Sequence, residues 1–542
     1  MTVIRNIKEK PLVLAVALAL LTTTNISVAD VTKPAKDKNT AEDTKSVEKK
    51  PAKDKKDKNA AEIGNGSAKD NNILVDEDGN YFVTKNGMVV DKKFTGKTQI
   101  NFWDESIANR NILSDQATML VTGTAKSRLN TFSGSSQQHL SEAKEDERNT
   151  QGRKGPVSDS DIFTDSSKQI AENSATVLGA KFYKQASRTL GIGATSEKSS
   201  FMDLSTQTVG MGAQSFRDKF AGNAAQTIRE GGTAQDTQFT DNASLNLEDG
   251  SESHNATFMD NSSAFIAPTA RMTGTTTMNG SSFLGVFADE GLFGEEKKQL
   301  ENVVLNNNSR LALLAVDGDD SHHVQAHEIT MNGGTIVFGH DKDQPYTFGH
   351  DKDQPYTTLK AEKVGGSGGT VIMNGSLISG ENDLLHVGIV TGNGAYSIIL
   401  NNQDSGKELP TDLRKLLVID QYDLNSAPTF NGPTVDQGTH KATLETKKDP
   451  NTGKTVVALV SDTKTTSWTT DAVMGLASAS QYIFDGEMQA LRTRRGDIQR
   501  FDQGAGGVWG RYLHNATDIT AGAGSDYRLG QNGMELGGGQ GI

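Results

Sequence analysis

Residues 241–282 read DNASLNLEDGSESHNATFMDNSSAFIAPTARMTGTTTMNGSS. A short phrase recurs in this stretch: an asparagine followed by small polar and β-prone residues, beginning at Asn242, Asn261 and Asn279. The interval is about 19 residues, and a turn plus a short strand repeated at such an interval is typical of a solenoid. The stretch therefore predicts a stack of similar coils.

The same phrase occurs on both sides of this stretch, at 173–177, 331–336 and 373–378. About 20 residues make one coil of a β-helix, in which short strands stack on their equivalents roughly 4.8 Å away. Each apolar side chain packs on the one in the next coil, and Gly or Asn takes the corner conformations that other residues resist. We therefore expect an all-β fold, a right-handed parallel β-helix over residues 73–385.

Two local features modify this expectation. Asp78-Gly79 and Asn86-Gly87, each flanked by β-forming residues, indicate a small hairpin cap at the N-terminal end. Farther along, the decapeptide FGHDKDQPYT occurs at 338–347 and again at 348–357. Because one copy is about half a coil long, we expect the duplication to form a loop that leaves the stack.

The N-terminal residues have the pattern of an export signal. Basic residues precede an apolar run at 11–21, and small residues precede Asp30, so we expect a signal peptide over 1–29 that is cleaved between Ala29 and Asp30. The run is too short to span a bilayer as a helix. Residues 30–72 are rich in lysine and acidic residues and contain no aromatic residue, which predicts a disordered arm.

Three further segments follow the predicted solenoid. Residues 386–464 contain longer strand-like runs and are expected to form a capping sandwich, since a terminal repeat must close the stack. Residues 465–505 are expected to contain a linker helix, because apolar positions within 471–500 are spaced for one face of a helix, with Thr470 or Asp471 as the N-cap. The final segment, 506–542, is rich in glycine.

Side chains alternate in character along this final segment. Val508, Gly510 and Tyr512 alternate with Trp509 and Arg511, and a second alternating run surrounds 533–536, with 515–525 as the intervening loop. The pattern predicts the first two strands of an outer-membrane β-barrel. Two strands leave open edges that hydrocarbon does not tolerate. We therefore expect a truncated barrel, a fragment or disrupted-gene product, and a periplasmic location for this form of the chain.

The order of these segments resembles that of the monomeric type V autotransporters of Gram-negative bacteria, in the pertactin-like group of diffuse-adherence adhesins. Gly222–Thr237 is similar to short Gly-Gly-x-Ala-x-x-Thr repeats of that group, and 468–512 is similar to its linker and first barrel strand. The resemblance implies that 386–464 is autochaperone-like. It also implies that an intact member is displayed at the cell surface through its own barrel, with the outer membrane and its barrel-assembly machinery as partners. The Asn-Asn pair at which some relatives are cut is missing from 487–491, so we expect no self-cleavage there.

Charge and cysteine content restrict the possible partners. The formal net charge is −13, which argues against nucleic acid, because a phosphate-binding surface needs clustered Lys and Arg. The sequence contains no cysteine, which suits a chain that must be exported without disulfide-bonded loops.

No pattern of catalytic residues stands out. The run Gln403-Asp404-Ser405-Gly406 only approximates a serine-protease motif, and Arg495-Gly496-Asp497 lies in the predicted helix. Five histidines lie near aspartates but match no metal-ligand spacing: His322, His323, His327, His340 and His350. We therefore predict no catalytic residue, no metal and no cofactor.

The principal hypothesis is a surface-displayed adhesin passenger that mediates cell-cell or cell-surface contact. Its partner would be a host or bacterial surface receptor or glycan. The alternative hypothesis is an exported β-helix enzyme that acts on polysaccharide. A groove of acidic and aromatic groups repeated on one face of the solenoid would favour this alternative.

Overall fold

The computed structural model describes residues 72–142, 155–288, 298–314, 322–340, 356–376, 381–402, 414–422, 428–437, 439–498, 507–520 and 526–539. The expected signal peptide, its cleavage site at Ala29 and Asp30, and almost all of the expected arm lie outside these ranges. The chain divides into two compact units, Ala61–Met474 and a second unit that contains Gly475–Ile542 with Met1–Ala60.

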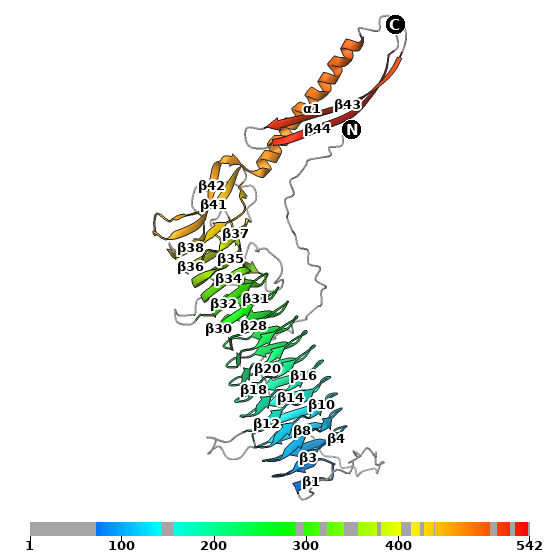
Figure 1. Ribbon diagram of the computed structural model, residues 1–542, viewed down its shortest axis with the longest axis vertical. Helices are drawn as coiled ribbons and strands as arrows, with labels where there is room; N and C mark the ends of the chain where they lie inside the picture. The colour runs from blue at the N-terminus through cyan, green and yellow to red at the C-terminus, as the bar shows by residue number, and fades with distance from the viewer. Residues whose placement is uncertain are drawn as a thin grey trace, which may run out of the picture. The chain divides into compact units, whose positions relative to one another are not determined.

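The larger unit is a parallel β-helix, as predicted (Figure 1). One coil, called a rung below, contains three short strands, and each strand pairs in parallel with its equivalent in the next rung. Equivalent residues are 19 positions apart over much of the stack, as between Lys184 and Asp203. The interval found in residues 241–282 is therefore the length of one rung.

The equivalent strands form three columns. Column A consists of β2 (Tyr81–Val83), β5 (Gln99–Phe102), β8 (Thr118–Thr122), β11 (Gln137–Ser141), β14 (Lys168–Ala171), β17 (Ser187–Leu190), β20 (Thr206–Val209), β23 (Ala225–Ile228), β26 (Ser244–Leu247), β29 (Ser263–Ile266), β31 (Phe283–Phe287) and β33 (Arg310–Leu314). Column B consists of β3 (Met88–Val90), β6 (Ile107–Asn109), β9 (Lys126–Arg128), β12 (Val157–Asp159), β15 (Thr176–Leu178), β18 (Thr195–Glu197), β21 (Gln214–Phe216), β24 (Thr233–Gln235) and β27 (Glu252–His254). Column C consists of β4 (Lys93–Phe94), β7 (Ile112–Leu113), β10 (Thr131–Phe132), β13 (Ile162–Phe163), β16 (Lys181–Phe182), β19 (Ser200–Phe201), β22 (Lys219–Phe220), β25 (Gln238–Phe239) and β28 (Thr257–Phe258).

Beyond this region the strands lengthen and the columns merge. β30 (Arg271–Met278) pairs with both β27 and β28, and β32 (Leu300–Asn306) stacks on β30. The next two strands, β34 (His322–His340) and β35 (Thr357–Gly375), each continue from one column into another. The first decapeptide copy begins inside β34, and the rest of the duplication up to residue 355 lies outside the described ranges.

The first rung is capped differently from the expectation. β1 (Ile73–Val75) pairs antiparallel with β2, so the turn signal at Asp78-Gly79 does form a hairpin. The second signal does not, because β3 pairs in parallel with β6. Asn86 has φ 63°, so it makes a corner of the first rung rather than a hairpin turn.

Aspartate takes many of the corner conformations expected of Gly or Asn. Asp241 and Asp260, each one residue before the repeated asparagine, have φ values of 57° and 60°, where Gly222 occupies the equivalent corner at 69°. The carboxylate of Asp241 also accepts the N–H of Gly222 at 2.9 Å. The bond to the preceding rung offsets part of the cost of the left-handed conformation.

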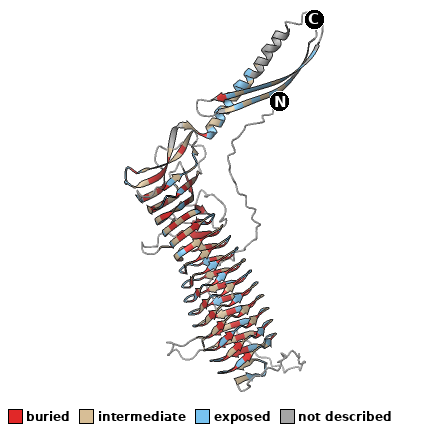
Figure 2. Ribbon diagram, viewed as in Figure 1, coloured by how far each residue is buried: buried red, intermediate tan, exposed pale blue. Residues whose placement is uncertain are grey.

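Buried positions recur from rung to rung along the stack (Figure 2), and most of them carry apolar side chains. Seven phenylalanines of column C form a continuous stack with centroid separations from 4.6 to 5.1 Å: Phe132, Phe163, Phe182, Phe201, Phe220, Phe239 and Phe258. Each ring is covered on both faces by its neighbours except at the ends. The solenoid thus acquires a core without a large globular cluster.

The expected boundary between residues 385 and 386 falls inside a strand of the solenoid. β36 (Leu384–Val390) pairs in parallel with β35 and with β38 (Arg414–Tyr422), and β37 (Ala395–Asn402) pairs in parallel with β35 and with β39 (Thr429–Asn431). Parallel stacking thus continues beyond residue 386, because longer strands follow the same columns.

The described end of the stack is covered by antiparallel strands. β42 (Thr455–Thr466) pairs with β38 and with β41 (His440–Lys448), which pairs with β40 (Val435–Gln437). Asp449, at the hairpin tip, accepts a hydrogen bond from Lys415 Nζ of β38 at 2.6 Å. The contact fixes the hairpin on the last parallel strands.

The helix begins earlier than predicted. α1 spans Trp468–Ile498, and the Ser467 hydroxyl accepts the N–H of Thr470 at 3.1 Å. Ser467 is therefore the N-cap, and the expected caps Thr470 and Asp471 lie inside the first turn. In the described part of the chain, no helix combines the length and apolar character needed to cross a bilayer.

The smaller unit contains two long antiparallel strands, β43 (Gly507–Thr520) and β44 (Asp526–Gly539). The residues expected to form the first barrel strand, Val508–Tyr512, lie in β43. The loop expected over 515–525 is shorter than predicted, because β43 remains paired with β44 up to Thr520. The hydroxyl of Tyr527 in β44 lies 2.6 Å from Ser478 Oγ of α1.

Candidate functional site

The outward positions of column A carry small hydroxyl side chains in register. Thr189, Thr208 and Thr227 are equivalent residues of three successive rungs, and Ser187 and Thr206 form a second ladder beside them. Neighbouring members of such a ladder are about 4.8 Å apart. The face therefore presents a regular array of donors and acceptors.

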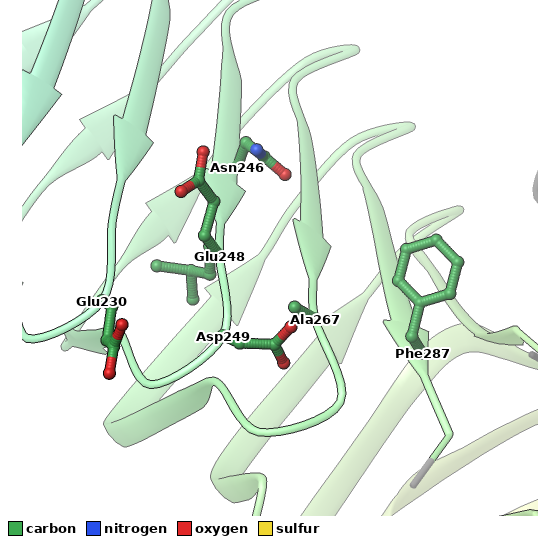
Figure 3. A pocket seen from close by; sticks show the side chains of 7 residues that line it. Glu230, Asn246, Glu248, Asp249, Ala267 and Phe287 are labelled. Atoms are coloured by element: carbon green, nitrogen blue, oxygen red, sulfur yellow. The ribbon is translucent and has the colours of Figure 1, made fainter. Parts of the chain in front are cut away.

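A hollow of about 390 Å³ lies at one corner of the stack (Figure 3). Three acidic residues line it, Glu230, Glu248 and Asp249, and Phe287 lies on its far side. Asp249 Oδ1 accepts a hydrogen bond from the hydroxyl of Thr269 at 2.8 Å. The remaining carboxylate oxygens could accept hydrogen bonds from hydroxyls or cations.

Polar side chains also enter the interior of the solenoid. The carboxylate of Asp161 is fully buried and accepts hydrogen bonds from Ser127 Oγ at 2.6 Å, Ser158 Oγ at 2.7 Å, Gln138 Nε2 at 2.9 Å and the N–H of Asn130 at 2.7 Å. Burial raises the pKa of Asp161 above its ordinary value, against the effect of these hydrogen bonds. None of these hydrogen-bond donors to the Asp161 carboxylate is a cation.

A second interior cluster contains a buried ion pair. Arg188 Nη2 donates to Asp218 Oδ2 at 2.6 Å, and Arg188 Nη1 donates to Ser199 Oγ at 2.7 Å. The guanidinium also lies over the rings of Phe182 and Phe201, 5.3 and 4.7 Å from their centroids. Burial lowers the pKa of Arg188, against the attraction of Asp218. Both clusters are sealed from solvent, so they are structural and not sites for a ligand.

Of the five histidines noted in the sequence, the structure describes the side chains of His323 and His327. His327 Nδ1 lies 2.6 Å from Glu362 Oε2 in a surface pair, and His323 is partly exposed on β34. His322 and His340 lie on β34, and His350 lies outside the described ranges. Within the described ranges, no group of three or more His, Asp or Glu side chains could hold a metal ion.

The other motifs noted in the sequence are only partly placed. Gln403-Asp404-Ser405-Gly406 lies outside the described residues. Arg495-Gly496-Asp497 lies on α1, as expected. The buried residues Asp161, Arg188 and Asp218 were missed by sequence reasoning. A signal was present, since polar residues recur at one strand position at rung spacing: Gln169, Arg188, Gln207 and Gln226.

Parts of the sequence match known proteins. Residues 326–457, which include the last parallel strands and part of the antiparallel cover, match the family model described as Pertactin. A stretch of 203 residues is 29% identical to "Autotransporter CRAC" of Citrobacter rodentium, and 60 residues are 40% identical to "Autotransporter adhesin/invasin TibA" of Escherichia coli. Over these stretches the chain is similar to type V autotransporters of the pertactin-like adhesin group.

The matches cover only a small part of these relatives. The match to the Citrobacter protein takes in 35% of this chain and 12% of that protein, and the match to TibA takes in 11% of this chain and 6% of TibA. Autotransporter relatives are exported to the outer membrane or the cell surface.

Solved structures of autotransporter passengers are also similar to this chain. A hyper-glycosylated TibA fragment is matched with a TM-score of 0.35 at 12% identity, over 56% of this chain and 97% of the fragment. The Hap adhesin of Haemophilus influenzae is matched with a TM-score of 0.30 at 13% identity, over 69% of this chain and 47% of Hap.

Proposed function

We propose that the solenoid is the passenger of an adhesin, displayed at the cell surface, where it mediates cell-cell or cell-surface contact. The observation that carries the proposal is the series of outward polar ladders in register, such as Thr189, Thr208 and Thr227. A rigid array of this kind can make many weak contacts at once, and linked contacts raise the overall strength of attachment.

We also propose that the passenger acts by binding and not by catalysis. Its outward side chains are presented on a regular stack, which suits repeated contacts with an extended surface. Catalysis would need an acid or base held against a substrate at hydrogen-bond distance.

Adhesion can be tested with fluorescent beads coated with the full chain. Beads that carry the folded chain should attach to epithelial cells or to bacteria. Beads that carry Phe201→Asp should not, because a buried carboxylate interrupts the phenylalanine stack and disorders the neighbouring rungs. Attachment no greater than that of albumin-coated beads would refute the adhesive function.

The proposal that binding is the activity has a separate test. The chain is incubated with acidic and neutral polysaccharides, and newly formed reducing ends and unsaturated products are measured. We expect no product above the buffer control. Product formation that is lost in Glu248→Gln would instead establish the alternative, an enzyme that acts on polysaccharide at the acidic hollow.

A further inference from the structure

Four exposed cations gather where columns B and C meet. Lys181 and Lys219 occupy equivalent outward positions of column C, each in register with Ser200 of the rung between them. Lys198 and Arg217 occupy equivalent corners of two successive rungs, directly after β18 and β21. These four residues are called the basic patch below.

The basic patch is not neutralised by its neighbours. Glu197 lies between its two corner cations, 3.1 Å from Lys198 and 3.0 Å from Arg217. No carboxylate of the described residues lies within ion-pair distance of Lys181 or Lys219. Asp218, although adjacent in sequence to Lys219, points into the core and pairs with Arg188. Asp236 occupies the corner of the next rung, equivalent to Arg217. The four positive charges of the patch are therefore accompanied by two negative charges, and the surface keeps a net positive charge.

The backbone does not require cations at these corners. Lys198 and Arg217 have φ values of 57° and 53°, and the equivalent residue of the preceding rung is Gly179 with φ 58°. Glycine adopts this conformation at lower cost than a residue with a side chain. Two long cationic side chains are nevertheless present there.

The rungs fix the spacing of the cations. Lys198 and Arg217 are one rung apart, about 5 Å, and Lys181 and Lys219 are two rungs apart, about 10 Å. The formal charge of the chain is −13, and the hollow at Glu230 and Asp249 is acidic. The basic patch is therefore a local positive surface on a negative molecule, and such a surface attracts extended anions selectively.

We propose that the basic patch binds a polyanionic polysaccharide, a chain of carboxylated or sulfated sugars lying across rungs β16 to β22. The proposal rests on the adhesive function above and specifies the class of its ligand. A polymer fits better than a small anion, because the cations are exposed and spread along the stack and do not converge on one point. Ser200 offers a hydroxyl between the two lysines, and half-buried Phe216 offers an apolar surface beside Arg217.

Binding of the full chain to immobilised polysaccharides tests the proposal. Heparin serves as the sulfated probe, polygalacturonate as the carboxylated probe and dextran as the neutral probe, with phosphatidylglycerol vesicles as a separate anionic surface. Lys181→Glu/Lys219→Glu should weaken binding to the acidic polysaccharides by about tenfold or more, because attraction becomes repulsion at two of four contacts. Binding should also weaken as salt increases.

The matched control is Lys97→Glu/Lys168→Glu. It makes the same change in net charge at two exposed lysines outside the patch, and it should change binding by less than about twofold. Circular dichroism establishes that both variants fold. Equal losses in the two double variants would show a general charge effect and overturn the proposal, as would equal binding to dextran or binding to vesicles alone.

The bead assay separates this proposal from the adhesive function. If wild-type beads attach to cells, soluble heparin or polygalacturonate should compete and the patch variant should attach poorly. Unchanged attachment of the patch variant would overturn the polysaccharide site and leave adhesion standing. Failure of the wild-type beads to attach, together with polysaccharide binding in solution, would instead refute adhesion and leave the site standing.

Discussion

Arg188 and Asp218 form an ion pair inside a solenoid whose core is mainly apolar. Their side chains are completely excluded from solvent and lie 2.6 Å apart. Buried ion pairs contribute little net stability, because desolvation offsets the attraction between the charges. Removal of one partner alone is costly, because it leaves the other charge buried without compensation.

Arg188→Gln alone should therefore lower the free energy of unfolding by about 3–5 kcal/mol. The double variant Arg188→Gln/Asp218→Ser should recover most of this loss. Gln207 and Ser199 already occupy the equivalent positions of neighbouring rungs, so both new side chains suit their sites. Urea denaturation followed by circular dichroism measures the effect. A double variant as unstable as the single variant would show that the pair itself holds the rungs together.

Asp383 is a second buried carboxylate without a cationic partner. It accepts the N–H of Thr357 at 2.8 Å and the N–H of Asn374 at 2.7 Å, which joins the two ends of β35. Burial raises the pKa of Asp383 to about 7, well above the usual range of an aspartate. Burial raises this pKa, and the hydrogen bonds from Thr357 and Asn374 lower it by a smaller amount.

The raised pKa of Asp383 predicts a dependence of stability on pH. A carboxyl whose pKa is higher in the folded state contributes stability that is complete below the unfolded pKa and is lost as pH rises through the folded pKa. The urea midpoint should therefore be higher at pH 5 than at pH 8. In Asp383→Asn the difference should shrink, and Asp161, whose pKa is also raised, accounts for what remains. A difference of wild-type size in Asp383→Asn would contradict this assignment.

At the level of elements, the repeated strands could be predicted from the hydrophobic and turn patterns of the sequence. The side-chain contacts between rungs could not. The interval between Asn242 and Asn261 predicts the rung, because every coil must turn at the same place. The inward direction of Asp161 and Arg188 was missed, since charged residues of short strands normally face solvent. Some of their partners lie 30 or more residues away, as between Asp218 and Arg188 or Ser127 and Asp161, and the register of the stack brings these residues together.

The limits of the elements were misjudged for a related reason. The boundary near 386 was set where the repeated phrase ends, but β36 and β38 continue the stack with longer strands. Likewise, the polar composition of 515–520 suggested a loop, although both faces of a strand in a hairpin can be polar. In both cases pairing with a neighbouring strand decides the structure more than local composition does.

The basic patch was not recognised in the sequence either. Lys181, Lys198, Arg217 and Lys219 are spread over 39 positions (181 to 219) and interrupted by acidic residues, so no run of basic charge is visible. They become neighbours only because each rung returns the chain to the same corner. The formal net charge of −13 is a sum over the whole chain, so it does not reveal this local positive surface.

At the level of the whole molecule, the passenger is a stack of rungs that are interchangeable when the register is kept. In a solenoid each repeat contacts only its neighbours, so removal of one whole repeat should leave two surfaces that still fit. Deletion of residues 225–243 removes one rung and joins Ala224 to Ser244. The junction keeps the register, because Ser244 is the equivalent of Ala225, which follows Ala224 in the intact chain. Deletion of residues 225–234 removes about half a rung and brings unlike columns together.

The most direct measurement is the comparison of these two deletions by thermal unfolding and limited proteolysis. The whole-rung deletion should unfold cooperatively and resist protease much as wild type does, with Phe220 stacked on Phe258 in place of Phe239. The half-rung deletion should be degraded rapidly, because its apolar residues face outward at the junction. Equal protease resistance of the two deletions, or equal loss in both, would contradict a stack of rungs with a period of 19 residues.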